Sequence, residues 1–462
     1  MKINVDCDTI IKDEGELVNF DKLSLLLDHK KYSEFIDEID KIDAVDAAEY
    51  LGYIGSSELL KVFRLLKKDF AAEVFTNLDS NIQEAIITSI TDTEISKLIE
   101  ELYIDDAVDL LEELPASMVN RIIRLSTPST RDEINKFLKY PPQCAGSVMT
   151  SEFINVYADM SVTEAIDRIR STGYDKETVY VIYVTDKTRV LMGVIELKDL
   201  LFSPADRLIN DIMKTAVKSA LTLDDRETVT ALISKYDLLA LPVVDSEKRL
   251  VGIVTVDDAL DVIEEEATKD IEIMAAISPT DKSYMKTGVF ETFKKRIPWL
   301  LLLLVSATFT ASIITYYEDA LGAMVTLTAF IPMLMDSGGN AGAQASVTII
   351  RGLSLGEIRV SDILRILWKE FRVSILCGVV LTCVLFLKAI YIDRVSLEIA
   401  AVVALTLFAT IVIAKLIGCS MPILAKRLGF DPAVMASPFI TTTVDALSLL
   451  IYFRIASLIL KI

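Results

Sequence analysis

The pattern of hydrophobic and polar positions changes twice along the 462-residue chain. Over residues 20–139, apolar positions recur at spacings of three and four, as they do on one face of an amphipathic helix. Polar segments such as DSNIQ, TDTEI and PASMV resemble helix starts between these runs. The pattern therefore predicts short amphipathic helices, stacked in a superhelix, within a helical N-terminal domain at 1–139.

An internal repeat follows the helical region. GSVMTSEFINVYADMSVTEAIDRI matches NDIMKTAVKSALTLDDRETVTALI, and VYVIYVTDKTRVLMGVIELKDLL matches ALPVVDSEKRLVGIVTVDDAL. Met149 pairs with Met213, and Gly193 pairs with Gly252. Each copy reads as a strand, a helix, a hairpin-like strand pair and a helix. The repeat resembles a tandem pair of CBS domains, at 140–205 and 206–262. That resemblance implies a regulatory module whose cleft allows an adenine nucleotide such as ATP to bind.

The last region carries five apolar stretches, at about 297–317, 321–350, 372–392, 399–424 and 433–461. Each is long enough to cross a bilayer, which takes about 20 residues. Basic residues gather before the first stretch and in every second loop, so the positive-inside rule predicts a cytoplasmic N-terminus and an external C-terminus. The segment MKINVDCDTIIKDEGELVNF shows no signal-peptide pattern, which predicts the same orientation. We expect a multi-pass protein of the cell (inner or plasma) membrane.

Charge is distributed unevenly between these regions. The formal net charge is −20, but the first 296 residues hold 57 acidic and 35 basic residues, a net of −22. An acidic surface repels nucleic-acid phosphates and attracts cations. One histidine and five cysteines without a CxxC motif argue against a zinc site. We therefore expect hard metal cations as partners and no nucleic acid.

Asp445 is the carboxylate that stands out in the fifth apolar stretch, ASPFITTTVDALSLLIYF. A carboxylate at bilayer depth costs about 2.5–3.5 kcal/mol on insertion scales, so such residues tend to be functional. The second stretch contains FIPMLMDSGGNAGAQASVTIIRG, in which Pro332, Gly338, Gly339 and Gly342 make a continuous straight helix unexpected. The alternative for these small residues is close helix packing. Asp445 favours a shared hydrophilic path.

The available ligand atoms limit the cargo. Carboxylate, amide, hydroxyl and carbonyl oxygens suit Mg²⁺, Ca²⁺ or Mn²⁺. One carboxylate per chain is too few for a dehydrated Ca²⁺ cage, but it suits a hydrated Mg²⁺ if a two-fold axis brings two copies of Asp445 together. The residues alone therefore predict a hard divalent cation and do not choose among these three ions.

An acidic segment, VDDALDVIEEEATKDIE, joins the repeat to the membrane region. Between Asp257 and Glu272 it holds eight acidic residues and one lysine. Such a helix repels itself unless cations neutralise it. The alternative is an ordinary solvated acidic helix, but the position of the segment between the two regions favours a regulatory role.

Several segments together resemble the MgtE family of magnesium channels and transporters: PSTRDEINKFLKYPPQCAGSVMT, VTVDDALDVIEEEATKDI, FKKRIPW, FIPMLMDSGGNAGAQ and GFDPAVMASPFITTTVDALSLLIYF. The resemblance covers essentially the whole chain. It implies a homodimer of chains with a helical regulatory domain, two CBS domains, a connecting (plug) helix at 263–290 and a five-helix transmembrane pore domain at 291–462. It also implies passive Mg²⁺ import that stops when Mg²⁺ binds the cytoplasmic domains.

The resemblance also assigns site residues. It makes Asp445 the pore carboxylate and implies a pore lined by Gly338, Gly339, Asn340, Ser437 and Thr441. It implies regulatory Mg²⁺ ligands at Asp105, Asp109, Asp225, Glu227, Asp237, Asp258, Asp261, Glu266 and Asp270. Lys269 stands where some members carry an acidic residue, which implies a weaker regulatory site.

Two other functions are compatible with these features. One is a transporter of broader range that includes Mn²⁺ or Co²⁺, and the other is a non-transporting membrane sensor whose CBS domains bind nucleotide. The glycine-rich stretch and Asp445 favour transport, because a membrane anchor needs neither. An enzyme is the weakest hypothesis, since we find no nucleophile–base set and no phosphate-binding loop.

Overall fold

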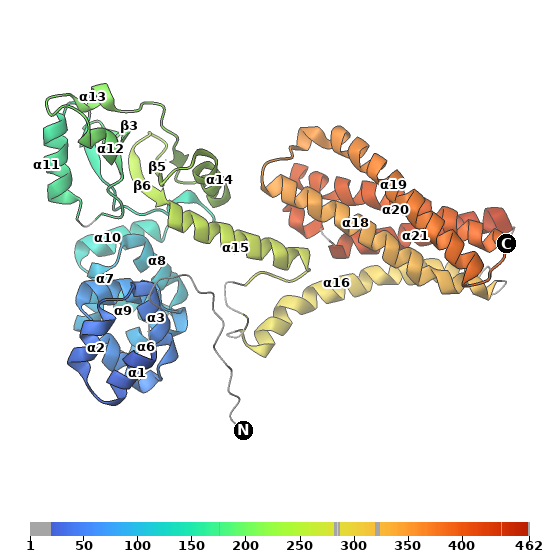
Figure 1. Cartoon of the computed structure of the whole chain (residues 1–462), viewed down its shortest axis with the longest axis horizontal. Coiled ribbons are helices and arrows are strands. Elements are labelled where there is room, and N and C mark those ends of the chain that lie inside the picture. The colour runs from blue at the N-terminus through green and yellow to red at the C-terminus, as the bar shows by residue number, and fades with distance from the viewer. Residues whose placement is uncertain are drawn as a thin grey trace. The chain divides into compact units, whose positions relative to one another are not determined.

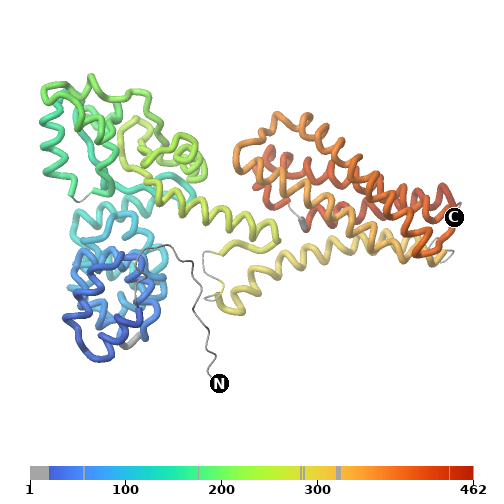
Figure 2. Tube along the Cα trace, viewed as in Figure 1, coloured from blue at the N-terminus to red at the C-terminus, as the bar shows by residue number. Residues whose placement is uncertain are grey.

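A computed structural model describes residues 20–174, 176–280, 284, 287–318, 324–435 and 437–460. The chain folds as two compact units, Met1–Leu260 and Asp261–Ile462. Figures 1 and 2 show the first ten helices of the first unit in blue to cyan, its repeat region in green, and the long helices of the second unit in yellow to red. The predicted combination of helical, α+β and long apolar regions is confirmed.

Short helices fill the first part of the first unit. Helices two apart in the sequence pack together, as α3 does with α5 and α7 with α9, while α8 contacts α6 and α10. Two offset rows of this kind form the predicted superhelix. The helices are α1 Phe20–Asp28, α2 Tyr32–Ile39, α3 Ala44–Tyr53, α4 Ser56–Phe63, α5 Lys68–Thr76, α6 Ser80–Ser89, α7 Asp92–Glu101, α8 Ile104–Glu113, α9 Ala116–Leu125 and α10 Pro128–Phe137.

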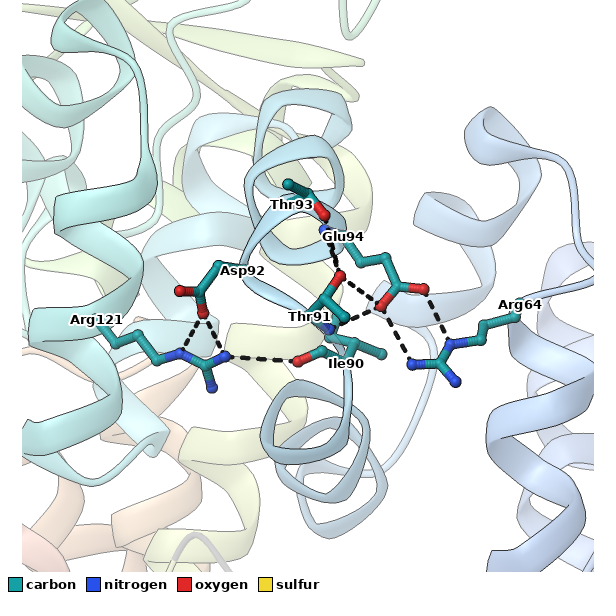
Figure 3. Close-up of polar contacts among 7 residues, drawn as sticks. All are labelled: Arg64, Ile90, Thr91, Asp92, Thr93, Glu94 and Arg121. Atoms are coloured by element: carbon teal, nitrogen blue, oxygen red, sulfur yellow. Dashed lines mark hydrogen bonds and ion pairs between the residues drawn. The ribbon is translucent and has the colours of Figure 1, made fainter.

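Helix α7 shows how the rows are joined (Figure 3). TDTEI begins it with a capping box, in which the Glu94 amide donates to Thr91 Oγ1 at 3.3 Å and the Thr91 amide donates to Glu94 Oε2 at 2.7 Å. From the C-terminal cap of α4, Arg64 Nε donates to Glu94 Oε1 at 2.9 Å. From α9, Arg121 Nε donates to Asp92 Oδ1 at 2.8 Å. The first turn of α7 therefore ties three helices together.

Two three-stranded sheets follow, with the same topology in each copy of the repeat. In each sheet the first strand pairs parallel to the second, and the second pairs antiparallel to the third, with Asn155 opposite Tyr183 and Ala220 opposite Val243. The elements are η1 Ala145–Ser147, β1 Asn155–Tyr157, α11 Val162–Thr172, β2 Val181–Thr185, β3 Leu191–Glu196, α12 Leu197–Leu201, α13 Ile209–Ile212, β4 Ala220–Leu221, α14 Arg226–Tyr236, β5 Ala240–Val244 and β6 Leu250–Thr255.

The paired positions of the repeat meet across the two copies. A Cβ on Gly193 would lie 2.7 Å from Met213 Sδ, and a Cβ on Gly252 would lie 2.7 Å from Met149 Sδ. Each glycine therefore makes room for the methionine of the other copy. This reciprocal packing explains why the sequence repeats both residue types.

Helix α15 (Val256–Met274) joins the two units and differs from the expected connecting helix at 263–290. It begins directly after β6 and ends at Met274, where Ala276 has a positive φ of 56°. A left-handed residue ends a helix, so the remainder of the expected range is not a continuation of α15. Residues 281–283, 285 and 286 of that range lie outside the described part of the chain.

The second unit is built from long helices. Within the described residues, four stretches are long and apolar enough to cross a membrane: Val289–Tyr316, Val360–Tyr391, Leu397–Arg427 and Pro432–Leu460. The predicted count of five is therefore not confirmed. Residues 321–323, 436 and 461 of the expected spans lie outside the described residues. The elements are α16 Val289–Tyr316, η2 Val325–Phe330, α18 Ile331–Ser354, η3 Val360–Asp362, α19 Ile363–Tyr391, α20 Leu397–Arg427, η4 Pro432–Met435 and α21 Ser437–Leu460.

The expected break in the second apolar stretch was wrong. Helix α18 is continuous from Ile331 to Ser354, and Pro332 sits in its first turn, where a missing amide hydrogen costs nothing. A Cβ on Gly338 would lie 2.6 Å from Thr410 Cγ2, and one on Gly418 of α20 would collide with the carbonyl oxygen of Gly342. The glycines therefore allow close packing, which was the alternative interpretation.

Candidate cation sites and membrane pathway

Six carboxylates of the first unit lie near enough to act on one another electrostatically, and we name them the carboxylate cluster. Asp105 and Asp106 lie in the first turn of α8, Glu152 and Glu177 come from loops of the first CBS copy, and the last two begin α15. The Glu177 amide donates to the Glu152 carbonyl at 2.9 Å, which holds the two loops together. The members are Asp105, Asp106, Glu152, Glu177, Asp257 and Asp258.

The electrostatics of the carboxylate cluster are unfavourable without a cation. Burial, followed by the charges of Asp106 and Asp258, raises the pKa of Asp105 well above its usual range. Burial and neighbouring carboxylates raise the pKa of Asp106 to about 6 and that of Glu177 to about 7. Within the described residues, Asp105 Oδ1 and Glu177 Oε2 are buried without a hydrogen-bond partner. Unpartnered buried oxygens of this kind are what a bound cation would satisfy.

The structure brings together only part of the predicted regulatory set. Asp105 and Asp258 share the carboxylate cluster, whereas Asp109, one turn further along α8, is exposed. Asp225 and Glu227 lie at the start of α14, where Asp225 caps the helix by accepting the Glu227 amide at 3.0 Å.

Asp237 ends the same helix, in a left-handed conformation with a φ of 51°. An 11-residue helix is about 16 Å long, so one ion cannot contact both ends of α14 within one chain. Asp237 is one of the residues that line a cleft of the CBS pair.

Further along α15, the predicted ligands have protein partners. Glu266 is buried, and its Oε2 lies 2.7 Å from Lys269 Nζ, so the lysine already offsets that charge. Asp270 Oδ2 accepts a hydrogen bond from Ser354 Oγ at 3.3 Å. Burial, followed by the charge of Asp431, raises the pKa of Asp270. Asp261 is exposed. The end of α15, which belongs to the second unit, therefore packs within that unit and places Asp270 near Asp431.

The cleft of about 730 Å³ that contains Asp237 is basic, and we name it the lysine cleft. Lys198, Lys214 and Lys218 line it together with the rings of Tyr180 and Tyr236. Glu196 holds two of the lysines, since Lys198 Nζ lies 2.6 Å from its Oε2 and Lys214 pairs with its Oε1. Cationic side chains beside exposed aromatic rings suit a ligand with a phosphate and a flat base.

In the second unit, the predicted pore residues gather where α18 meets α21. A Cβ on Gly339 would lie 3.0 Å from Thr441 Cγ2, and one on Gly338 would lie 2.9 Å from Val444 Cγ1. Asp445, next to Val444, is half-buried, and Asn340 is exposed on the single chain. The side chain of Ser437 lies outside the described residues.

The sequence interpretation missed several acidic residues at these places. Asp336 on α18 acts electrostatically on Asp445. It was missed because the interpretation of its segment rested on the glycines that follow it. Asp106, Glu152 and Glu177 were missed because only the tertiary fold brings their segments together. Within the described part of the chain, no three His, Cys, Asp or Glu side chains are close enough to hold one metal ion directly.

Comparison with known proteins decides the family. A family model described as a divalent cation transporter matches residues 331–455, one for the MgtE intracellular N domain matches 27–143, and one for the CBS domain matches 145–206 and 209–265. The magnesium transporter MgtE of Thermus thermophilus is 37% identical over 87% of this chain and 89% of that protein. That of Bacillus subtilis is 35% identical over 85% of this chain and 86% of that protein. The chain belongs to the MgtE family.

Solved MgtE-type structures resemble the first unit of this MgtE-family chain. The soluble part of a magnesium transporter aligns with a TM-score of 0.52 at 31% identity, covering 54% of this chain and 98% of that one. The cytosolic domain of the Mg²⁺ channel MgtE in complex with ATP aligns with a TM-score of 0.50 at 34% identity, covering 53% and 99%. The predicted helical domain followed by paired CBS domains is thereby confirmed.

Proposed function

We propose that this MgtE-family chain is a subunit of a Mg²⁺ channel or transporter of the cell membrane that intracellular Mg²⁺ closes. The observation that carries the proposal is the carboxylate of Asp445, half-buried in an apolar helix beside the tightly packed α18. An ionisable group at that depth marks an ion pathway. Relatives named as magnesium transporters support the choice of Mg²⁺.

The second unit is the membrane domain in this proposal. Helix α18 has 24 residues, about 36 Å, which suffices to cross the hydrocarbon core as a fifth span beside the four apolar stretches. The distribution of basic residues between the loops supports a cytoplasmic N-terminus and an external C-terminus. The functional divisions are then 1–139, 140–205, 206–262, the connecting segment 263–290 and the pore domain 291–462.

In a homodimer, the polar side of α18 can face the second chain instead of lipid. Asn340 and Gln344 are exposed on the single chain, and a polar helix face directed at lipid is unfavourable. A two-fold axis beside this face brings two copies of Asn340 and Asp445 around one pathway. Paired carboxylates there hold a hydrated Mg²⁺ through its water molecules, which this ion releases reluctantly.

The carboxylate cluster is the sensor in this proposal. Without cations its members repel one another, which loosens the contact between α8, the first CBS copy and the start of α15. Bound Mg²⁺ offsets this repulsion and stabilises the compact, closed state. By linkage, the state that Mg²⁺ stabilises binds Mg²⁺ more tightly. The predicted ligands Asp109, Asp225, Glu227, Asp261, Glu266 and Asp270 add further weak sites.

The lysine cleft is a second regulatory site, for an adenine nucleotide such as ATP. Its lysines attract the phosphates and its tyrosine rings stack on the base. A relative's cytosolic domain in complex with ATP supports this ligand class. We infer that bound nucleotide stabilises the same compact state and raises the apparent Mg²⁺ affinity.

A broader cargo is the main alternative. All candidate pathway ligands are oxygens, which also accept Mn²⁺ or Co²⁺, and the matching family model is described only as a divalent cation transporter. Neither Mg²⁺ transport nor transport of a broader set of divalent cations involves catalysis, and we propose that the protein is not an enzyme.

Metal flux into proteoliposomes tests the proposal. The full-length protein should carry Mg²⁺ whether or not a pH or Na⁺ gradient is present, and Asp445→Ala should abolish that flux while assembling normally. Mn²⁺ and Co²⁺ should be carried less well. Unchanged Mg²⁺ flux through the alanine variant would remove the pore assignment, and flux only under a gradient would show coupled transport.

A further inference from the structure

Helix α18 presents a polar stripe that the proposed pathway uses only in part. Asp336, Asn340, Gln344 and Thr348 follow one another at intervals of four residues, and all four are exposed on the single chain. Residues four apart lie on one helix face, so these side chains form a continuous line. The other face carries the buried glycines that contact α20 and α21. The stripe begins with a carboxylate.

The contacts between α18 and α21 fix the level of Asp336 relative to Asp445. A Cβ on Gly342 would meet Ile440 at 2.7 Å, whereas one on Gly338 would meet Val444 at 2.9 Å and Ser448 at 3.2 Å. The two helices are therefore antiparallel, and Asp445 lies near the level of Gly338. Asp336 lies about 3 Å further along the axis, at a rise of 1.5 Å per residue.

The charge of Asp336 acts on the carboxyl group of Asp445. Within the described residues, no hydrogen bond or ion pair holds Asp336. An uncompensated carboxylate on a helix of a membrane domain needs a partner from outside the chain.

We propose that Asp336 is a second cation-binding carboxylate of the membrane pathway and that it determines selectivity for divalent ions. The inference rests on the proposed function and adds a residue to it. Asp336 and Asp445 together supply two negative charges per chain, and four in a dimer. Coulomb attraction scales with the product of the charges, so doubling the site charge favours divalent over monovalent cations. Carboxylates at two levels also contact a hydrated ion at more than one of its waters.

Mg²⁺ block of monovalent current through the full-length, reconstituted protein tests this role. In Asp336→Asn the Mg²⁺ concentration for half-block should rise by about tenfold, as expected for the loss of one nearby charge. The permeability ratio of Mg²⁺ to K⁺ should fall with it, and Asp336→Glu should stay close to wild type. Glu398→Gln is the matched control, because it removes an exposed carboxylate at the start of α20 and should change neither quantity.

The outcomes separate this inference from the proposed function. A wild-type protein that neither carries Mg²⁺ nor is blocked by it would refute the function itself. A Mg²⁺-blocked wild type with an Asp336→Asn variant within twofold of it would overturn only the role of Asp336. Asp336→Ser is measured in parallel, in case the asparagine variant does not assemble. If neither neutral variant assembles while Asp336→Glu does, the charge serves assembly, and the proposal is overturned as well.

Discussion

The CBS pair has two places that correspond in its internal repeat, the lysine cleft and the carboxylate cluster, and they carry opposite charge. Val194 and Lys214 exchange backbone hydrogen bonds of 2.9 and 3.0 Å in one, and Ile253 and Thr150 exchange bonds of 2.8 and 2.9 Å at the matching place in the other. The backbones are therefore alike. In the repeat, Lys198 corresponds to Asp257.

This difference in charge indicates that the side chains, and not the fold, determine which ligand binds. The lysine cleft is open and suits an anion, whereas the carboxylate cluster is closed over by α8 and suits a cation. One module can thereby combine two signals. We expect each of the two places to bind its own ligand, and we expect both ligands to stabilise the same compact state.

The largest expected effect comes from neutralising the carboxylate cluster. Asp105→Asn, Glu177→Gln and Asp258→Asn together should abolish the increase in protease resistance that Mg²⁺ gives the full-length protein, because the cation loses its ligands. The exposed Asp206→Asn is the control and should respond as wild type does. An unchanged Mg²⁺ midpoint in the triple variant would contradict the assignment.

The second prediction concerns pH at the same cluster. Raised folded-state pKa values mean that stability without Mg²⁺ is highest below the unfolded values near 4 and is lost as the pH rises through about 6 and about 7. Between pH 5 and pH 8 the first unit should lose on the order of 4 kcal/mol of unfolding free energy, because Asp106 and Glu177 keep their protons to about one and about two units above pH 5, at about 1.4 kcal/mol per unit. Saturating Mg²⁺ should remove most of this dependence. Denaturant unfolding that is flat with pH would disprove the electrostatic penalty.

The third prediction concerns the lysine cleft. Lys214→Ala should weaken ATP binding by about tenfold, since it removes one charge-assisted contact, while leaving the Mg²⁺ response without nucleotide unchanged. Calorimetry with ATP and with Mg²⁺ separates the two, and the exposed Lys187→Ala serves as control. Wild-type ATP affinity in Lys214→Ala, or no heat with millimolar ATP in any protein, would exclude this site.

The smallest effect is expected at Glu266. Because Lys269 already pairs with it at 2.7 Å, Glu266→Gln should shift the Mg²⁺ midpoint of closure by less than about twofold. Lys269→Gln should shift that midpoint to lower Mg²⁺, since it frees a carboxylate. A Glu266→Gln effect as large as that of the triple variant would show that the pair opens to bind Mg²⁺.

Most of the fold could be predicted from the spacing of apolar residues and from the internal repeat. The three-and-four spacing of apolar residues predicted the superhelix, and the Gly193–Gly252 and Met149–Met213 pairs predicted two copies of one module, because both signals are local in sequence. The predicted break in α18 was wrong, because the sequence does not distinguish a glycine-rich helix break from a close crossing with α20.

The sites were less accessible to sequence. Asp105 and Asp258 were each expected among the regulatory ligands through a family resemblance, but their proximity was not predicted, and the fold places both in one cluster. Glu152 and Glu177 have no local signal, because each becomes part of the cluster only when the first CBS copy packs against α8. Whether the predicted ligands bind Mg²⁺ stays a prediction that the variants above test.

The central claim is that cytoplasmic Mg²⁺ closes the pathway that carries it. Single-channel or macroscopic K⁺ current in excised patches, recorded while cytoplasmic Mg²⁺ is raised through the millimolar range, tests it most directly. The account predicts that wild-type current falls steeply, and that Asp258→Asn combined with Asp261→Asn keeps the channel open at Mg²⁺ levels that close the wild type. Closure of the double variant over the wild-type range would show that the acidic start of α15 is only a solvated linker, and would contradict the account.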